Sequence, residues 1–248
     1  MPPYARRGLH GQVVHEVGRR IVLGELTPGG TLDLEALERE YGVSRTVVRE
    51  AVKVLEAKGL LQARPKRGTI VRERERWNLL DPDIISWRLS GGPDVDFLTD
   101  LSELREAFEP AAARLAAARA APSDIAAMRA ALTALHAHRG DLEASTTADV
   151  ALHRAIVAAT GNELLTRISA LLEAGLRGRD QLAFVHGWDT AYLDLHTRVV
   201  DAIEAGDAAV AETAMRTLVT EAAGDVAKAL SHPTVPVSAR TASNDSTD

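Results

Sequence analysis

The sequence predicts a mainly α-helical protein built from two domains and a disordered tail. Its 248 residues fit one large domain or two small ones. Hydrophobic residues make up 46% of the chain and aromatic residues only 4%, and the abundance of alanine and leucine favours helices over a β-sandwich or barrel. Apolar residues recur at helical spacing over most of the chain, and glycines and prolines separate the repeats.

The composition excludes several kinds of site and location. The chain has no cysteine, which excludes disulfides, thiolate metal sites and cysteine nucleophiles. No apolar run approaches the roughly 20 residues of a membrane span, so we expect no membrane partner. The first residues lack the apolar core of a signal peptide, and we therefore expect a cytoplasmic protein.

Residues 1–76 form the first predicted domain. Helices and strands are expected in the order helix 13–22, helix 34–41, helix 44–58, strand 60–64 and strand 69–72. Ser44 is a good N-cap for the third helix. Three helices followed by a hairpin are typical of a winged helix-turn-helix domain.

The third helix has two different faces. Val48 and Leu55 belong to an apolar stripe, whereas Arg45, Arg49 and Lys53 follow one another at four-residue spacing on another face. Such a helix fits the major groove of DNA, where an arginine can bond to guanine through two N–H groups. A basic stripe alone is also typical of a solvated surface helix, but the order of the elements favours DNA binding.

Two further segments supply contacts to the DNA backbone. Ser44 and Thr46 lie near the N-terminus of the third helix, where exposed N–H groups favour phosphate. The hairpin turn 66–68 places cations beside the backbone or the minor groove, and its glycine permits a close approach. The predicted DNA-contacting residues are therefore Ser44, Arg45, Thr46, Arg49, Lys53, Lys66, Arg67 and Gly68.

The formal net charge of −6 is unevenly distributed along the chain. Residues 1–76 hold 15 basic and 10 acidic residues, whereas the remainder holds 14 basic and 25 acidic residues. The first part therefore carries +5 and the rest −11. This asymmetry indicates a basic module that binds nucleic acid, joined to an acidic module that does not.

Residues 77–231 form the second predicted domain, and residues 232–248 the disordered tail, because that tail is rich in serine, threonine and proline. Helices are expected at residues 82–89, 94–120, 123–138, 142–160, 163–177, 190–205 and 207–230. Glycines or prolines lie between most of them, which indicates an antiparallel all-helical bundle. Residues 72–76 alternate in charge and are expected to form a solvated linker.

Several motifs of the first domain resemble the GntR family of bacterial transcription regulators. They are Pro28-Gly29, residues 41–51 (YGVSRTVVREA), residues 59–61 (GLL) and residues 64–69 (RPKRGT). The resemblance implies a dimer that binds operator DNA through Arg45, Thr46, Arg49 and the hairpin turn. This chain departs from the family at Glu35, where many members carry an arginine.

The second domain resembles the effector domain of the FadR branch of that family, a helical bundle, over about residues 81–230. The motifs that carry the resemblance include Glu103-Leu104-Arg105, residues 149–153 (DVALH), Gly161-Asn162 and Leu195-His196. Residues 77–88 resemble the junction of galactonate-type regulators of sugar-acid catabolism. This likeness implies a polyhydroxy carboxylate as the effector.

Asp149, His153 and His196 are the candidate metal ligands. The first two are one helical turn apart and share a face, and an antiparallel bundle can bring His196 alongside. A carboxylate with imidazoles suits a divalent metal such as zinc, although a surface pair or a hydrogen-bonded core histidine would give the same pattern. The resemblance implies one aspartate and three histidines, but the fourth place falls at Leu218. The site therefore binds metal through three ligands with open positions, binds it weakly, or binds none.

Arg105 and Trp188 are the candidate effector-binding residues. Arg105 lies in an apolar stretch of a helix and needs an anionic partner when buried. The resemblance favours an effector carboxylate, which matches the planar guanidinium; a salt bridge with Glu103, Glu106 or Glu109 is the alternative. Trp188 either closes such a pocket or belongs to the core.

Together these features predict a homodimeric, ligand-responsive repressor of a sugar-acid operon, and not an enzyme. Each subunit would bind one half of a palindromic operator, and a small carboxylate bound in the helical domain would lower the affinity for DNA. Two alternatives stay open. One is a metal-dependent enzyme that uses Asp149, His153 and His196, since two histidines and one carboxylate also bind iron in oxygenases. The other is a constitutive DNA-binding dimer without an effector.

Overall fold

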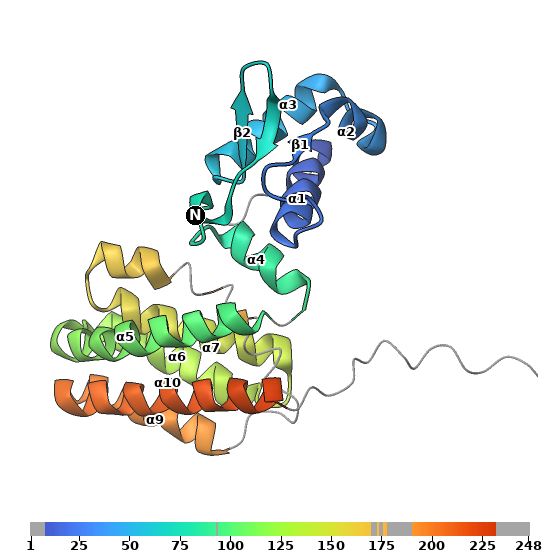
Figure 1. Cartoon of the computed structure of the whole chain (residues 1–248). Helices are drawn as coiled ribbons and strands as arrows, with labels where there is room; N and C mark the ends of the chain where they lie inside the picture. The colour runs from blue at the N-terminus through green and yellow to red at the C-terminus, as the bar shows by residue number, and fades with distance from the viewer. Residues whose placement is uncertain (1–7, 93, 170–172, 174–175, 178–189, 232–248) are drawn as a thin grey trace, which may run out of the picture.

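The computed structural model describes residues 8–92, 94–169, 173, 176–177 and 190–231. A smaller N-terminal domain, which contains the only sheet among these residues, stands at one end of a longer bundle of helices (Figure 1). The predicted fold class, a winged helix-turn-helix domain followed by an antiparallel helical bundle, is confirmed. Trp188 and the predicted tail lie outside the described residues.

The N-terminal domain has the predicted three helices and hairpin, with one additional short strand. Its elements are α1 (Gly8–Val22), β1 (Thr31–Leu32), α2 (Leu34–Tyr41), α3 (Arg45–Ala57), β2 (Leu61–Arg64) and β3 (Gly68–Val71). The strands pair antiparallel in the order β1-β3-β2. Between α2 and α3, Gly42 takes the left-handed conformation with φ 61°, which ends α2 and turns the chain into the next helix.

The expected linker is an ordered part of the N-terminal domain. Residues Arg74–Arg76 form a 3₁₀ turn, and the indole Nε1 of Trp77 donates a hydrogen bond to the carbonyl oxygen of Arg72. The next helix, α4 (Pro82–Ser90), was expected to belong to the second domain, but its Ile84 and Trp87 lie in the core of the first. The reason is that α1 offers an apolar surface on which α4 packs.

The contact between α1 and α4 is close and specific. Gly18 lies against the ring of Trp87, and a Cβ at this position would overlap that ring. The indole Nε1 of Trp87 donates a hydrogen bond to Nδ1 of His15, with 2.8 Å between the two nitrogens. At the start of α4, Lys58 Nζ lies 2.9 Å from Asp81 Oδ1 and 2.6 Å from Asp83 Oδ2. Packing, a hydrogen bond and buried ion pairs therefore hold α4 on the N-terminal domain.

The junction between α4 and the bundle is spanned by one ion pair. Arg88 of α4 donates to Asp94, with Nε 2.7 Å from Oδ2, and the guanidinium lies over the ring of Phe97. Gly92, between them, has φ 113°, a conformation that glycine adopts readily. Another face of α4 places Ile85 in a small core with residues of the following helix. The helix α4 therefore contacts both domains.

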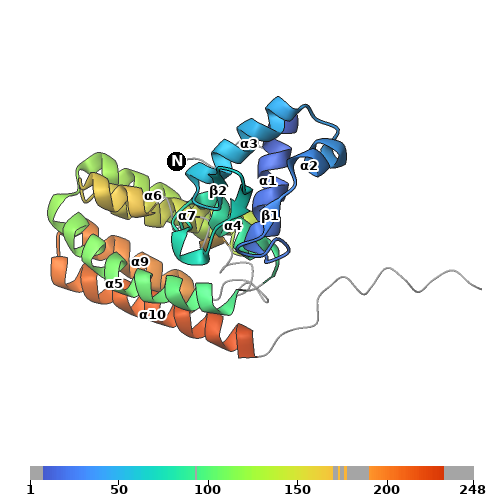
Figure 2. The same ribbon diagram turned by 45° about the horizontal axis from the view of Figure 1, so that its top comes forward.

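The bundle follows the predicted boundaries closely. Its main helices are α5 (Val95–Arg119), α6 (Pro122–Ala137), α7 (Leu142–Ala158), α9 (Thr190–Glu204) and α10 (Ala208–Ser231). Residues 163–169 are also helical. Helices α5 and α10 run side by side, with α9 next to α10 (Figures 1 and 2). The buried faces of these helices form one continuous apolar core. No helix in the described part of the chain is long and apolar enough to cross a membrane.

The contact between Gly18 and Trp87 generates a stability prediction. Alanine in mid-helix usually stabilises a protein relative to glycine by roughly 0.5–1 kcal/mol, but at position 18 the added methyl group overlaps the indole ring. We expect Gly18→Ala to lower the free energy of unfolding by about 1–3 kcal/mol, as overpacking does. Urea unfolding monitored by tryptophan fluorescence measures this change.

The matched control is Gly224→Ala. Gly224 is also inside a helix, and a Cβ there meets nothing within 4 Å, so this variant should be as stable as the parent or slightly more stable. Equal unfolding midpoints for the two variants would show that α4 does not constrain position 18.

Candidate functional site

Helix α3 presents the predicted basic face to solvent. Ser44 caps the helix, and its Oγ accepts a hydrogen bond from the backbone N–H of Val47 at 3.5 Å. The apolar side of α3 is buried in the domain core, through Val48, Ala51, Val52 and Leu55. The side chains on the opposite side are exposed, namely Arg45, Thr46, Arg49 and Lys53. The helix therefore has the apolar back and basic front that the major groove requires.

The basic side chains of α3 differ in whether they form an ion pair with an acidic residue. Lys53 Nζ lies 2.7 Å from Glu50 Oε1 one turn earlier, a pairing that the sequence analysis did not consider. Within the described part of the chain, Arg45 and Arg49 form no ion pair. These two arginines are therefore better placed than Lys53 to bond to bases or phosphates.

The hairpin turn carries the other predicted contacts. Lys66, Arg67 and Gly68 are all exposed at the tip between β2 and β3, which is the outer end of the hairpin in Figure 1. Both Lys66 (φ 63°) and Gly68 (φ 79°) have left-handed backbone conformations, and that makes the turn tight. Contact of these residues with DNA stays a prediction.

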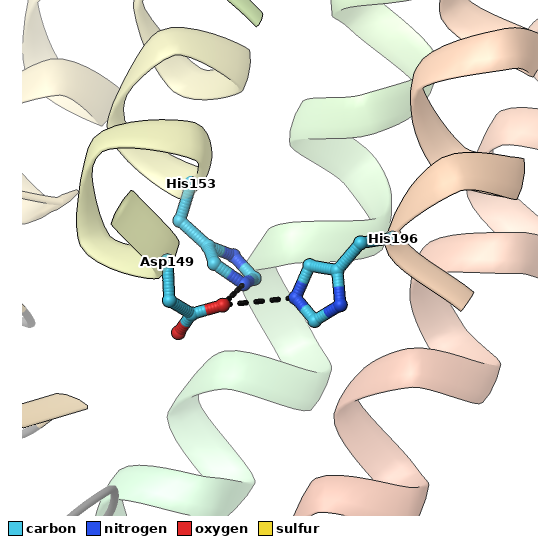
Figure 3. Close-up of side chains that lie close together, drawn as sticks. All are labelled: Asp149, His153 and His196. Carbon is cyan, nitrogen blue, oxygen red and sulfur yellow. Dashed lines mark ion pairs between the residues drawn. The ribbon is translucent and has the colours of Figure 1, made fainter. Parts of the chain in front are cut away.

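The structure brings the three candidate metal ligands together in the bundle. Asp149 and His153 come from α7 and His196 from α9, and their side chains converge (Figure 3). Asp149 Oδ1 lies 2.9 Å from His196 Nε2 and 3.6 Å from His153 Nε2. All three residues are buried, with at most 5% of their surface exposed, so the alternative of a surface pair is wrong.

The outer nitrogens of both histidines face groups that only accept hydrogen bonds. Nδ1 of His196 lies 2.8 Å from the carbonyl oxygen of Tyr192, and Nδ1 of His153 lies 2.8 Å from Glu109 Oε2. Each Nδ1 must therefore carry the proton. A neutral imidazole then has its lone pair on Nε2, and both Nε2 atoms point towards Asp149.

This arrangement places three electron-pair donors around one point. Each Nε2 atom lies near Asp149 Oδ1, but neither forms a hydrogen bond of good geometry with the described residues. The lone pairs of these three atoms face one another with no positive charge between them. Protonation of His196 does not supply that charge, because burial lowers the pKa of His196 despite the nearby charge of Asp149. A cation between the three atoms would accept their lone pairs. Two imidazoles with one carboxylate suit a divalent metal such as zinc. The residues present therefore fit a metal.

No fourth ligand of the expected kind joins the group in the described part of the chain. Leu218 is 2% exposed and belongs to the apolar core of the bundle. Tyr192, which the sequence analysis missed, donates its hydroxyl hydrogen to Asp149 Oδ1 at 3.0 Å; its place four residues before His196 was the available signal. Three protein ligands would leave coordination positions open to water or to a bound molecule.

Arg105 has a protein partner, and that partner is Glu109. Arg105 Nε lies 2.6 Å from Glu109 Oε1, and Nη2 lies 3.3 Å from Oε2. Both residues are buried. Burial alone would raise the pKa of Glu109, but the charge of Arg105 and the hydrogen bonds donated by His153 and Arg105 bring that pKa far below its usual range, so Glu109 is a carboxylate. Of the three glutamates that the sequence left open, this one has the helical i+4 spacing.

A small cavity reaches this group of residues. Phe108, Glu109, His153 and Val157 contribute to its wall. Its volume of about 10 Å³ is close to the minimum that holds one water molecule. A sugar acid is larger than this, so binding beside His153 would require the wall to move.

Comparison with known proteins identifies the chain. Residues 9–71 match the bacterial regulatory proteins of the gntR family, and residues 100–221 match the FCD domain. The galactonate operon transcriptional repressor of Escherichia coli (strain K12) is 35% identical over 215 residues, which cover 84% of this chain and 92% of that protein. The chain belongs to the gntR family. As such it is a DNA-binding transcriptional regulator, and the enzyme alternative loses its support because the matched proteins are regulators.

Another relative and two solved structures are also similar to this chain. An E. coli (strain K12) protein named for regulation of the L-lactate dehydrogenase operon is 32% identical over 219 residues, covering 84% of this chain and 83% of that protein. The solved structure described as "Lar controls the expression of the Listeria monocytogenes agr system and mediates virulence" has a TM-score of 0.65 at 19% identity, covering 91% of this chain and 99% of that one. E. coli McbR/YncC has a TM-score of 0.52 at 20% identity, with 89% and 98% covered. These structures support the fold alone.

The buried ligand group generates a metal-binding prediction. We expect the purified protein to bind zinc in a one-to-one ratio and His196→Gln to bind it far more weakly, since loss of a ligand should exceed the roughly 10–100-fold effect of losing an outer-shell partner. Zinc titration against a competing chelator measures both affinities. The control is His138→Gln, because His138 is exposed at the end of α6. Equal zinc affinity in all three proteins would contradict the site.

Proposed function

We propose that this protein is a homodimeric, metal-containing repressor of an operon for hydroxy-carboxylate catabolism. Its α3 helices and hairpin turns bind a palindromic operator, and a small carboxylate bound in the helical domain releases it. The observation that carries the proposal is the buried convergence of Asp149, His153 and His196 in a domain separate from the exposed basic helix. One domain thus offers a DNA-binding surface and the other a place for a metal and its ligand.

The DNA-binding part divides into two kinds of contact. Arg49 lies near the middle of the exposed face of α3 and is the candidate for reading a base in the major groove. Ser44 and Thr46 at the helix N-terminus, and Lys66 and Arg67 in the hairpin turn, suit phosphates. Because a palindromic operator repeats the same half-site, a symmetric dimer places one such surface on each half. These contacts occur on chromosomal DNA, and we infer that the protein acts in the cytoplasm.

Charge balance in the bundle supports an anionic effector. The buried group contains two negative residues, Asp149 and Glu109, and one positive residue, Arg105. A divalent metal turns this single negative excess into a single positive excess, which one carboxylate neutralises. Buried charge is costly unless it is compensated nearby. A metal and a monocarboxylate together therefore complete the site.

The class of carboxylate follows from metal chemistry and from the relatives. One matched relative is named for the galactonate operon and another for the L-lactate dehydrogenase operon, and both compounds carry a hydroxyl group next to the carboxylate. Such a molecule can offer two oxygens to a metal that has open positions. We therefore favour a 2-hydroxycarboxylate, and a sugar acid in particular, as the effector.

A constitutive DNA-binding dimer is the second candidate function. Two observations favour it: Arg105 is already paired with Glu109, and Leu218 stands where a fourth metal ligand is expected. In that case the bundle would only hold the two subunits together. Response to a ligand separates the two functions, since a constitutive dimer shows none.

Replacing Arg49 tests the DNA-binding surface. We expect Arg49→Ala to weaken specific operator binding by about 1–3 kcal/mol, measured by fluorescence anisotropy with labelled operator. Lys53→Ala, on the same helix, should have a smaller effect because Glu50 already compensates this lysine. An unchanged affinity for Arg49→Ala would contradict the assignment of α3 as the reading helix.

Adding galactonate tests the effector-binding domain. We expect it to weaken operator binding by about 5–150-fold, the usual range of coupling between two sites, and only in the zinc-loaded protein. Asp149→Asn should bind the operator normally but fail to respond. If a panel of sugar acids and lactate leaves operator affinity unchanged in zinc-loaded protein, the constitutive alternative is favoured instead.

A further inference from the structure

The polar contacts around the metal ligands continue into α5. Arg105 contacts Glu109, Glu109 contacts His153 at 2.8 Å, and His153 and His196 both face Asp149. Each of these five residues is at most 5% exposed. The proposed metal site uses only three of them. The other two, Arg105 and Glu109, are charged, buried and without a role in metal ligation.

The two histidines are oriented by different kinds of partner. Nδ1 of His196 faces the backbone carbonyl of Tyr192, one turn earlier on the same helix, so the partner of this nitrogen belongs to α9 itself. Nδ1 of His153 faces the carboxylate of Glu109 on a different helix. The orientation of His153 therefore depends on the packing of α5 against α7 and on the charge of one side chain.

A carboxylate behind a metal-binding histidine has a defined chemical effect. It holds the proton on Nδ1, which leaves the lone pair on Nε2, and it fixes the plane of the ring. It also makes Nε2 a stronger electron donor to a metal. An amide in place of the carboxylate offers a weaker acceptor and can turn its NH₂ group towards the ring, which favours the opposite tautomer.

Arg105 has the corresponding effect on Glu109. Its Nε and Nη2 groups engage both carboxylate oxygens, which fixes the plane of the carboxylate as well as its charge. A lone buried carboxylate would be costly, so the arginine makes this placement possible. With both oxygens of Glu109 on its fork, Arg105 already has an anionic partner inside the protein.

We propose that Glu109 is a positioning residue for the metal ligand His153, and that Arg105 acts through Glu109 and not as the direct anchor of the effector. This inference rests on the proposed metal site. An effector carboxylate then binds at the open positions of the metal, while α5 supports the site from behind.

The first test measures zinc affinity in the full-length protein with a competing chelator. We expect Glu109→Gln to bind zinc about 10–100-fold more weakly than the parent, the range typical of lost outer-shell partners. The control is Glu103→Gln, an exposed glutamate on the same helix, which should bind zinc like the parent. Unchanged affinity in Glu109→Gln would overturn the inference while leaving the metal site intact. A parent protein that binds no zinc would overturn both.

Two further variants test the role of Arg105 and the role of the carboxylate charge separately. The pair Arg105→Met with Glu109→Gln removes both charges together, and we expect its zinc affinity to match that of Glu109→Gln alone, because Arg105 acts only through Glu109. A further tenfold loss in the double variant would overturn the role given to Arg105. Glu109→Asp keeps the charge and should recover part of the affinity, whereas affinity no better than that of Glu109→Gln would count against positioning by the carboxylate.

A spectroscopic measurement separates positioning from general stability. Imidazole ¹⁵N NMR of the metal-free protein reports which nitrogen of each histidine carries the proton. We expect His153 to be protonated at Nδ1 in the parent and to become a mixture of tautomers in Glu109→Gln, while His196 stays protonated at Nδ1 in both. An unchanged His153 spectrum in Glu109→Gln would overturn the proposal.

Discussion

Buried charge that must be neutralised within the bundle is the constraint on which the functional part of this protein depends. The core around α5, α7 and α9 is largely apolar, and both Asp149 and Glu109 are buried in it. Each carboxylate therefore needs a cation or a proton donor at a fixed place. Arg105 supplies one such partner, and a metal would supply the other. The arrangement links metal binding to the packing of three helices that are distant in the sequence.

The sequence predicts the helices well because capping residues at their N-termini mark where they begin. Ser44 caps α3, and aspartates at the starts of α4, α5 and α7 cap those helices in the same way. The strand β1 was missed because it has only two residues and exists through its pairing with β3. Similarly, the sequence did not reveal that α4 packs on α1, because the two helices are far apart in the chain.

The sequence predicts only part of the candidate site, because spacing reveals contacts within one helix but not contacts between helices. Asp149 and His153 share a helical face, which spacing alone reveals; an antiparallel bundle can bring His196 alongside, and the family resemblance supports all three residues. The contact between Glu109 and His153 crosses between two helices, so no periodicity in either helix could show it. The choice of Glu109 over Glu103 and Glu106 as the partner of Arg105 was available from i+4 spacing. Tertiary contacts between polar side chains are therefore the information that needed a structure.

The attachment of α4 to the N-terminal domain has a mechanical consequence. Trp87 and Lys58 fix α4 on that domain. We therefore expect α3, the hairpin and α4 to move together as one rigid body. The hinge lies at the short junction around Gly92. The ion pair between Arg88 and Asp94 spans this hinge. A small rotation about this hinge would displace the basic face of α3 by a larger distance, because α3 lies far from the hinge.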